Sequence, residues 1–198
     1  MTETRRRGRR PSGADTKTAL IEAATEAFAA QGYDKATVRD IAGRAGVDPA
    51  MVNHWFGGKE GLFAAAMQIP VNPAEIIEGA LRGGREHAGE QLVRTFLHVW
   101  DTTGGGVFAG LVRSVAGHEL AAKLLREFVT RFIFGRLAKE IGADRPELRG
   151  ALTGSQMVGL GMMRYVVKLE PIASADHDTL ARAIGPTIQR YLTGDIDI

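Results

Sequence analysis

Residues 37–56, which read TVRDIAGRAGVDPAMVNHWF, decide the fold of this chain. The pattern predicts two short helices that are joined by a tight turn containing Gly46. Thr37 is placed to cap the first helix and Asp48 the second, with Pro49 at a first helical position where its missing N–H costs nothing. Because a small turn residue lets the second helix cross the first steeply, this stretch predicts a helix-turn-helix.

Helical spacing separates two faces on the second of these helices. Val52 and Phe56 are four residues apart and are expected to point into the core. The opposite side presents Pro49, Ala50, Asn53 and His54. A helix lying in the major groove of DNA reads base edges with its N-terminal residues, and an Asn side chain is suited to adenine.

Residues 48–56 contain no Lys or Arg, so any contacts with phosphate must come from neighbouring segments. The candidates for those contacts are Thr37, Arg39, Arg44 and Lys59. Backbone N–H groups at the helix starts near Thr37 and Lys59 can also receive phosphates.

The rest of the chain predicts an all-α protein, because helical periodicity is widespread and strand signals are nearly absent. Pro70 and Pro73 mark a break between a helix-turn-helix domain over 15–69 and a larger helical bundle over 70–198, to which the family resemblance described below assigns effector binding and dimerisation. The expected helices cover 15–31, 37–45, 48–56 and 59–68, then 74–81, 88–101, 107–115, 119–141, 146–169 and 178–192.

The positive charge of the chain is concentrated at its start. Residues 1–12 hold five Arg and one acid, which leaves 20 basic and 22 acidic residues in the remainder. We expect 1–14 to form a disordered basic arm that attracts polyanions. The chain has no Cys, no transmembrane-length apolar run and no apolar signal-peptide centre, so we expect a cytoplasmic protein with no membrane partner.

From about 17 to 63 the chain resembles the DNA-binding domain of the TetR family of transcriptional regulators. The matching residues are Phe28, Gly32 and Tyr33, then Thr37, Ile41, Ala42, Ala45, Gly46 and Val47, then Phe56, Lys59, Glu60 and Leu62. Asn53 stands where the family typically has a tyrosine in the recognition helix, followed two positions on by Trp55. The resemblance implies an all-helical homodimer that is released from a palindromic operator when a small-molecule effector binds, and repression is the family's usual mode of action.

The resemblance also implies which residues lie at or near double-stranded DNA: Thr37, Arg39, Asn53, His54, Trp55 and Lys59. Family members dimerise through their last two helices, which here would be about 147–169 and 178–192. The first contains Gly154, Gly159 and Gly161, which favour close helix approach. That approach is expected at the dimer interface, although packing within one subunit is the alternative.

An effector cavity in the second domain would be built from large apolar side chains. The candidates are Phe96, Trp100, Phe108, Phe128, Phe132, Met157 and Tyr165. Arg113 and Arg164 are placed either to orient an anionic effector or to pair with acids.

The sequence offers no motif for catalysis, a metal or a cofactor, because His-Glu-x-x-His, Glu-x-x-His and phosphate-loop patterns are missing. We therefore expect a non-enzymatic regulator that needs no metal and no cofactor. The alternative is a helical interaction module whose Arg arm binds anionic surfaces. The sequence does not identify the effector, the operator or the regulated genes.

Overall fold

The computed structural model describes residues 13–67, 69, 72–117 and 119–196, and within these ranges the chain contains helices but no strand. The all-α prediction is thereby confirmed for this part of the chain. The fold divides into two compact units, Met1–Ala66 and Met67–Ile198. The predicted basic arm lies outside the described residues except for Gly13 and Ala14, which are helical.

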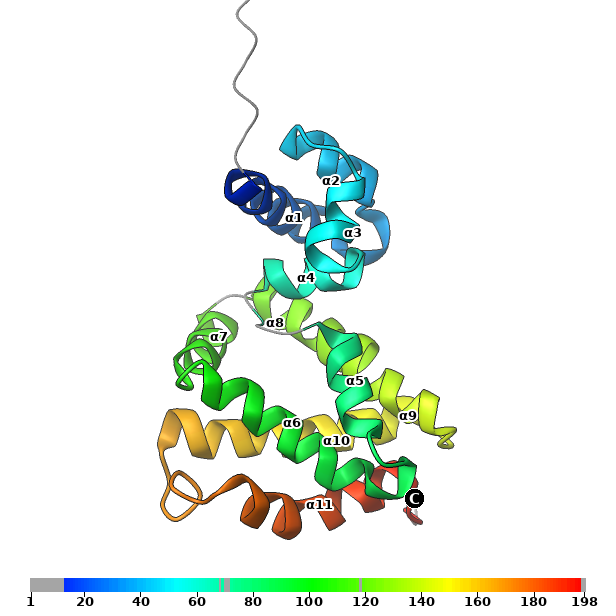
Figure 1. Ribbon diagram of the computed structural model, residues 1–198, viewed down its shortest axis with the longest axis vertical. Coiled ribbons are helices and arrows are strands. Elements are labelled where there is room, and N and C mark those ends of the chain that lie inside the picture. The colour runs from blue at the N-terminus through cyan, green and yellow to red at the C-terminus, as the bar shows by residue number, and fades with distance from the viewer. Residues whose placement is uncertain (1–12, 68, 70–71, 118, 197–198) are drawn as a thin grey trace, which may run out of the picture. The chain divides into compact units, whose positions relative to one another are not determined.

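The described part of the first unit, residues 13–66, contains four helices (Figure 1): α1 Gly13–Lys35, α2 Val38–Ala45, α3 Ala50–Phe56 and α4 Lys59–Ala66. α1 begins two residues before the predicted start, so Asp15 lies in its first turn, where a negative charge favours the helix dipole. Gly32 (φ 75°, ψ 171°) interrupts the helical backbone near the predicted end. A short turn continues from there to Lys35.

The core of the first unit is an aromatic cluster of Phe28, Tyr33 and Phe63, all three buried. Phe63 meets both other rings edge-on, at centroid distances of 4.8 Å from Phe28 and 5.1 Å from Tyr33. These contacts join the two ends of the unit in sequence, because Phe28 lies on α1 and Phe63 on α4. The short α2 and α3 are held on this α1–α4 frame by their own apolar faces.

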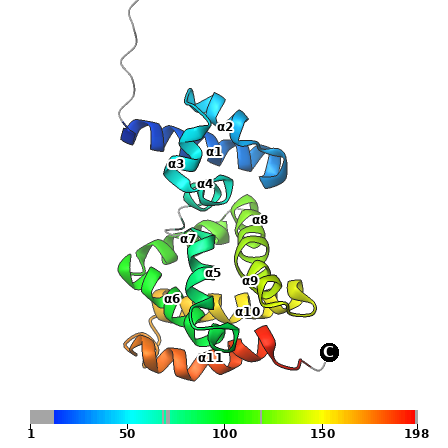
Figure 2. The same ribbon diagram turned by 45° about the vertical axis from the view of Figure 1, so that its right-hand side comes forward.

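The second unit is a larger bundle. Its helices are α5 Pro73–Leu81, η1 Arg85–His87, α6 Ala88–Thr102, α7 Gly106–Gly117, α8 Glu119–Glu127, η2 Phe128–Phe134, α9 Gly135–Ile141, α10 Pro146–Gly161, η3 Met162–Val167 and α11 His177–Thr193. The two helices predicted over 119–141 and 146–169 each contain a π-helical segment, η2 and η3. Figure 2 shows α10 and α11 running alongside each other at one end of this unit.

A close crossing of α6 and α11 fixes one side of the bundle. A Cβ atom at Gly89 would lie 2.3 Å from the carbonyl oxygen of Gly185, and one at Gly185 would lie 2.6 Å from Cγ of Glu90. Gln189 Oε1 accepts a 2.8 Å hydrogen bond from the backbone N–H of Gly89. Only glycine at both positions allows the two backbones to come this close.

The glycines of α10 correct part of the sequence interpretation. A Cβ atom at Gly154 would lie 2.9 Å from the Phe134 ring, and one at Gly161 would lie 2.3 Å from the Phe108 ring. These two glycines therefore serve packing within one subunit, and the expectation that they mark a dimer interface is wrong. A Cβ atom at Gly159, by contrast, would meet nothing within 4 Å.

Arg149 ties the start of α10 to the end of α11. Its buried guanidinium donates to the Asp144 carboxylate at 2.6 Å and 2.7 Å, and to the carbonyl oxygens of Tyr191 and Gly194 at 2.8 Å and 3.0 Å. The hydrogen bonds from Arg149 and Arg145 hold the pKa of Asp144 below its usual range. A buried charge is tolerated here because every contact is a charge-assisted hydrogen bond.

Candidate nucleic-acid interface and ligand cavity

Local hydrogen bonds and glycine geometry set the α2–α3 arrangement. The Thr37 hydroxyl accepts the Asp40 N–H at 3.1 Å, so the predicted cap is confirmed. Gly46 ends α2 in the left-handed conformation (φ 69°, ψ 28°), within the turn that the sequence predicted. The Asp48 carboxylate accepts the Ala50 N–H at 2.7 Å, which satisfies a free donor at the start of α3.

The two faces of α3 separate as the spacing predicted. Val52 and Phe56 are buried, and they share the core of the unit with Ile41 and Ala42 of α2. The other face is exposed and carries Pro49, Ala50, Asn53, His54 and Trp55. Because the buried face holds α3 to the unit, its exposed face is free for a partner.

Trp55 is a large apolar group on this exposed face, with 37% of its surface accessible. Its ring meets the His54 ring edge-on at a centroid distance of 4.9 Å. Both rings lie in the C-terminal half of α3, after Asn53. The surface therefore combines small side chains at the start of the helix, the polar Asn53 in its middle and aromatic groups at its end.

The three predicted phosphate-binding cations lie in different surroundings. Arg39 is exposed on α2. Arg44 is also exposed, but its Nε donates to the Asp40 carboxylate at 3.1 Å, which offsets part of its charge. Lys59 starts α4, with Nζ 4.2 Å from the centroid of the Tyr33 ring. The aromatic core thus positions Lys59 through a cation–π contact with Tyr33. The sequence pattern did not reveal this contact.

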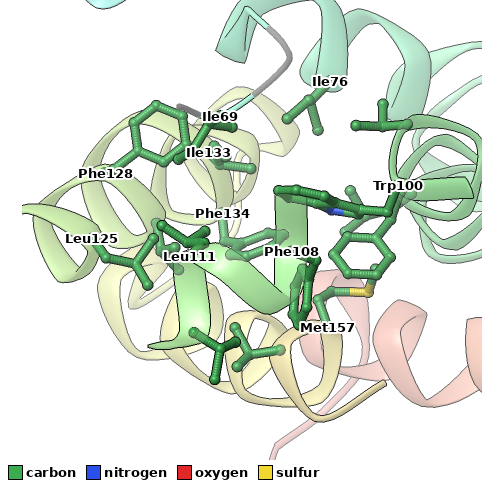
Figure 3. Close-up of a pocket in the computed structure, with 16 residues that line it drawn as sticks. Ile69, Ile76, Trp100, Phe108, Leu111, Leu125, Phe128, Ile133, Phe134 and Met157 are labelled. Carbon is green, nitrogen blue, oxygen red and sulfur yellow. The ribbon is translucent and has the colours of Figure 1, made fainter. Parts of the chain in front are cut away.

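The second unit encloses a cavity of about 80 Å³. It is lined by Ile69, Ile76, Leu92, Phe96, Val99, Trp100, Phe108, Leu111, Val112, Leu125, Phe128, Val129, Ile133, Phe134, Met157 and Val158. Figure 3 shows these side chains converging from several helices around the Trp100 indole. Every lining residue belongs to an apolar type. The cavity can therefore bury the apolar surface of a ligand, but it provides no charged side chain to bind one.

Five of the seven predicted cavity residues line this space: Phe96, Trp100, Phe108, Phe128 and Met157. Phe132 is buried but is not among the lining residues, and Tyr165 borders a different, polar cleft. The aliphatic lining residues were missed, because an aliphatic residue at helical spacing has the same pattern whether it packs in a core or faces a cavity.

The aromatic residues of the cavity form a connected group. Trp100 and Phe108 meet edge-on at a centroid distance of 5.0 Å, and Phe96 lies 6.1 Å from Trp100 and 6.0 Å from Phe108. Phe108 also contacts Tyr165 at 5.6 Å. A change in the position of Phe108 would therefore be felt both in the cavity and at the polar cleft next to it.

The polar cleft has a volume of about 310 Å³ and is organised around Asp101 at the end of α6. The Asp101 carboxylate accepts hydrogen bonds from Arg164 at 2.9 Å and 3.2 Å and from the Tyr165 hydroxyl at 2.6 Å. It also lies 2.7 Å from His177 Nε2. Partial burial opposes ionisation, but the hydrogen bonds from these three residues hold the pKa of Asp101 well below its usual range.

The contacts with Asp101 also change the pKa values of Tyr165 and Arg164. Burial, and then the hydrogen bond to Asp101, raises the pKa of Tyr165 above its usual range. Arg164 also donates to the carbonyl oxygens of Ile172 and Ala175, at 2.8 Å and 2.9 Å. Of the two arginines considered as effector contacts, Arg164 pairs with the Asp101 carboxylate. The other, Arg113, is exposed.

The described part of the chain has neither a cluster of metal ligands nor a membrane-spanning helix. No group of three or more His, Cys, Asp or Glu side chains is arranged to hold a metal ion there. No helix in the same ranges combines the length and apolarity needed to cross a membrane.

Comparison with known proteins matches both units to one family. Residues 20–66 match the model of bacterial regulatory proteins of the tetR family, and residues 86–192 match a tetracyclin repressor-like C-terminal domain. The HTH-type transcriptional regulator BetI 1 of Chromohalobacter salexigens is 27% identical over 155 residues, which cover 68% of this chain and 70% of the relative. An HTH-type transcriptional regulator BetI of Escherichia coli is 27% identical over 163 residues, with 70% and 83% covered.

Among solved structures, a TetR-family regulator from Streptomyces coelicolor is 36% identical, with 94% of this chain and 99% of that chain covered and a TM-score of 0.49. The C-terminal family model alone spans more than half of the chain. The chain belongs to the TetR family of transcriptional regulators, with a helix-turn-helix DNA-binding domain followed by a C-terminal ligand-binding domain.

Proposed function

We propose that this protein is a homodimeric repressor that binds a palindromic operator through α3 and leaves it when a small molecule occupies the cavity of the second unit. The exposed face of α3 carries this proposal. It is a short helix, capped at its start and held by a buried apolar face, that presents Asn53 and His54 to solvent. Such a helix fits the major groove.

In this proposal, base reading and positioning are divided between different residues. Asn53, with Pro49 and Ala50, faces the base edges, because these residues lie on the exposed side of the first turns of α3. Thr37, Arg39, Arg44 and Lys59 contact phosphates from α2 and the start of α4, with His54 and Trp55 beside the backbone. The absence of Lys and Arg from 48–56 leaves α3 without the common Arg-to-guanine contact.

Dimerisation through α10 and α11 is supported by the small and apolar residues that these helices expose. On α10 they are Leu148, Ala151, Ser155, Val158 and Gly159, and on α11 they are Ala183, Pro186 and Thr187. Both sets recur at three- and four-residue intervals and therefore form a stripe on each helix. A second copy of the chain would cover both stripes and form a four-helix interface within about 147–169 and 178–192.

Ile69 is the residue through which we propose that the cavity acts on the DNA-binding unit. It is buried, it lines the cavity, and it follows the end of α4 by only three residues in sequence. Ile76 of α5 lines the cavity as well. A ligand that displaces these two side chains would move the chain segment between the two units and thereby change the spacing of the two α3 helices in the dimer.

The proposal is tested by measuring affinity for a duplex recovered from a random pool and for single-base variants of it. Arg39→Ala should weaken binding to every duplex and lower the salt dependence, because it removes a phosphate contact. Asn53→Ala should reduce discrimination at one base step, by about 1–3 kcal/mol. Arg126→Ala, an exposed arginine on α8, is the matched control and should change neither quantity.

Two results would contradict this assignment. If Arg39→Ala and Asn53→Ala bind every duplex as the unmodified protein does, the α2–α3 surface is not the DNA site. If Asn53→Ala weakens all duplexes equally, Asn53 contacts phosphate and does not read a base.

A further inference from the structure

The chemistry of the cavity wall restricts what can enter it. None of the described side chains that line it is Lys, Arg, His, Asp or Glu. The charged groups of the adjacent cleft are satisfied internally, because Arg164 and Asp101 pair with each other there. A charged ligand group in this cavity would be buried without a partner, which costs several kcal/mol.

Trp100 is the one described lining residue whose side chain carries a hydrogen-bond donor, the indole Nε1–H. Trp100 is buried, and its backbone oxygen accepts hydrogen bonds from the Thr103 hydroxyl and from the N–H of Gly105. Among the residues that the structure describes, its indole N–H has no acceptor. Trp N–H groups in proteins usually find a partner, so this donor can serve an acceptor atom of a ligand that reaches it.

The size of the cavity adds a second restriction. At about 80 Å³ it is smaller than the cavity of roughly 150 Å³ that holds a benzene molecule. A ligand must therefore displace lining side chains to enter. A small or flat molecule displaces fewest of them, and the aromatic edges of Phe96, Trp100 and Phe108 favour a planar one.

We infer that the effector is a small, uncharged and largely apolar molecule with one hydrogen-bond acceptor, such as an aryl ketone or ester, whose oxygen receives the Trp100 N–H. This inference rests on the proposed function of the cavity as the effector site. Trp100 is then the residue that determines ligand specificity, because the other lining side chains contribute only apolar contacts. It also excludes carboxylates and quaternary ammonium compounds as effectors.

Four one-ring probes test the inference by calorimetric titration of the full chain. Ethylbenzene supplies the apolar part alone, acetophenone adds a neutral acceptor, benzoate adds a negative charge, and benzyltrimethylammonium adds a positive one. The two neutral probes should bind, and the two charged probes should bind at least about 100-fold more weakly than acetophenone, because of the uncompensated charge.

Trp100→Phe isolates the contribution of the indole N–H, since it keeps an aromatic ring and removes the donor. The dissociation constant of acetophenone should rise by roughly threefold to tenfold relative to that of ethylbenzene in this variant. Trp55→Phe is the matched control, because Trp55 is the other tryptophan of the chain and lies in the first unit. The ratio of the two constants should be unchanged there. In Trp55→Phe, the remaining Trp100 fluorescence should change as the neutral probes bind.

Three outcomes would overturn the inference: no binding of either neutral probe at millimolar concentration, binding of a charged probe as tight as that of acetophenone, or a ratio unaffected by Trp100→Phe. A separate assay of DNA affinity with saturating acetophenone distinguishes this failure from a failure of the proposed function. Selective acetophenone binding that leaves DNA affinity unchanged would support the cavity chemistry and contradict the proposed release mechanism.

Discussion

Asp101 joins more segments of the second unit than any other carboxylate described above. Its hydrogen bonds reach Arg164 and Tyr165 on η3 and His177 at the start of α11, while Asp101 itself lies on α6. Because Arg164 also holds the carbonyl oxygens of Ile172 and Ala175, the loop before α11 depends on the same cluster. A single carboxylate therefore connects three helical segments next to the cavity.

The depressed pKa of Asp101 predicts how stability depends on pH. A carboxylate whose pKa is lower in the folded state stabilises the fold above its unfolded pKa, about 3.9, and loses that contribution as the pH falls toward the folded value. Asp101→Asn should therefore lower the free energy of unfolding by about 2–3 kcal/mol at pH 7. The difference from the unmodified protein should shrink below about pH 4.

Urea unfolding at pH 7, 5 and 3, at one protein concentration, measures this difference. Asp195→Asn is the control, because Asp195 is exposed and its substitution should change stability by less than about 0.5 kcal/mol. A deficit in Asp101→Asn that stays constant from pH 7 to pH 3 would show that the ionised carboxylate is not the source of the stability.

Residues whose role is set by near neighbours in sequence were the predictable ones. The Thr37 cap and the Gly46 stop depend on atoms within five residues, so the sequence alone reveals them. The partner of Arg164 lies 63 residues away, and the ring that packs against Gly161 belongs to another helix. Helical spacing contains no information about such partners, which is why Arg164 had two interpretations and Gly161 was wrongly assigned.

At the scale of elements, α10 has two faces with different functions. One face is packed within the subunit, through Gly150 against Gly135 and Gly161 against Phe108. The other exposes Leu148, Ala151 and the open side of Gly159. The sequence predicted where this helix lies but did not separate the faces, because small residues occur on both.

If the exposed face of α10 forms the dimer interface, a charged side chain placed on it should prevent dimerisation. Ala151→Glu should convert the dimer to a monomer, because the new carboxylate would be buried without a partner against a second copy. Ala116→Glu, at an exposed position of α7 outside the proposed interface, is the matched control and should remain a dimer. Light scattering after size-exclusion chromatography measures the mass of each. An Ala151→Glu protein of unchanged dimer mass would place the interface elsewhere.

The predicted helices of the second unit match the observed ones closely, but the π-helical character of η2 and η3 was not foreseen. Periodicity detects a continuous helix whether or not one turn is widened. η2 supplies Phe128, Val129, Ile133 and Phe134 to the cavity wall, so the unforeseen segment shapes the candidate site. π-helical turns occur frequently at functional sites, and η2 is an example because it places four side chains in the cavity wall.

At the scale of the whole molecule, the first unit was more predictable than the second. The α2–α3 surface is built from one continuous stretch, so its exposed residues follow from a single helical register. The cavity is assembled from six helical segments and from Ile69, which lies outside any helix, and its lining could be predicted only in part. The effector class therefore comes from the three-dimensional wall and not from any motif.

Selection of bound duplexes from a random DNA pool, with the full-length protein at near-physiological salt, tests the central claim most directly. A dimeric repressor that reads DNA with α3 should enrich a palindrome. Its half-sites should be separated by one helical turn of DNA, about 34–36 Å, or by a whole multiple of that distance. Recovery of no enriched sequence, or of a single half-site without symmetry, would contradict a dimer that reads its operator through two copies of α3.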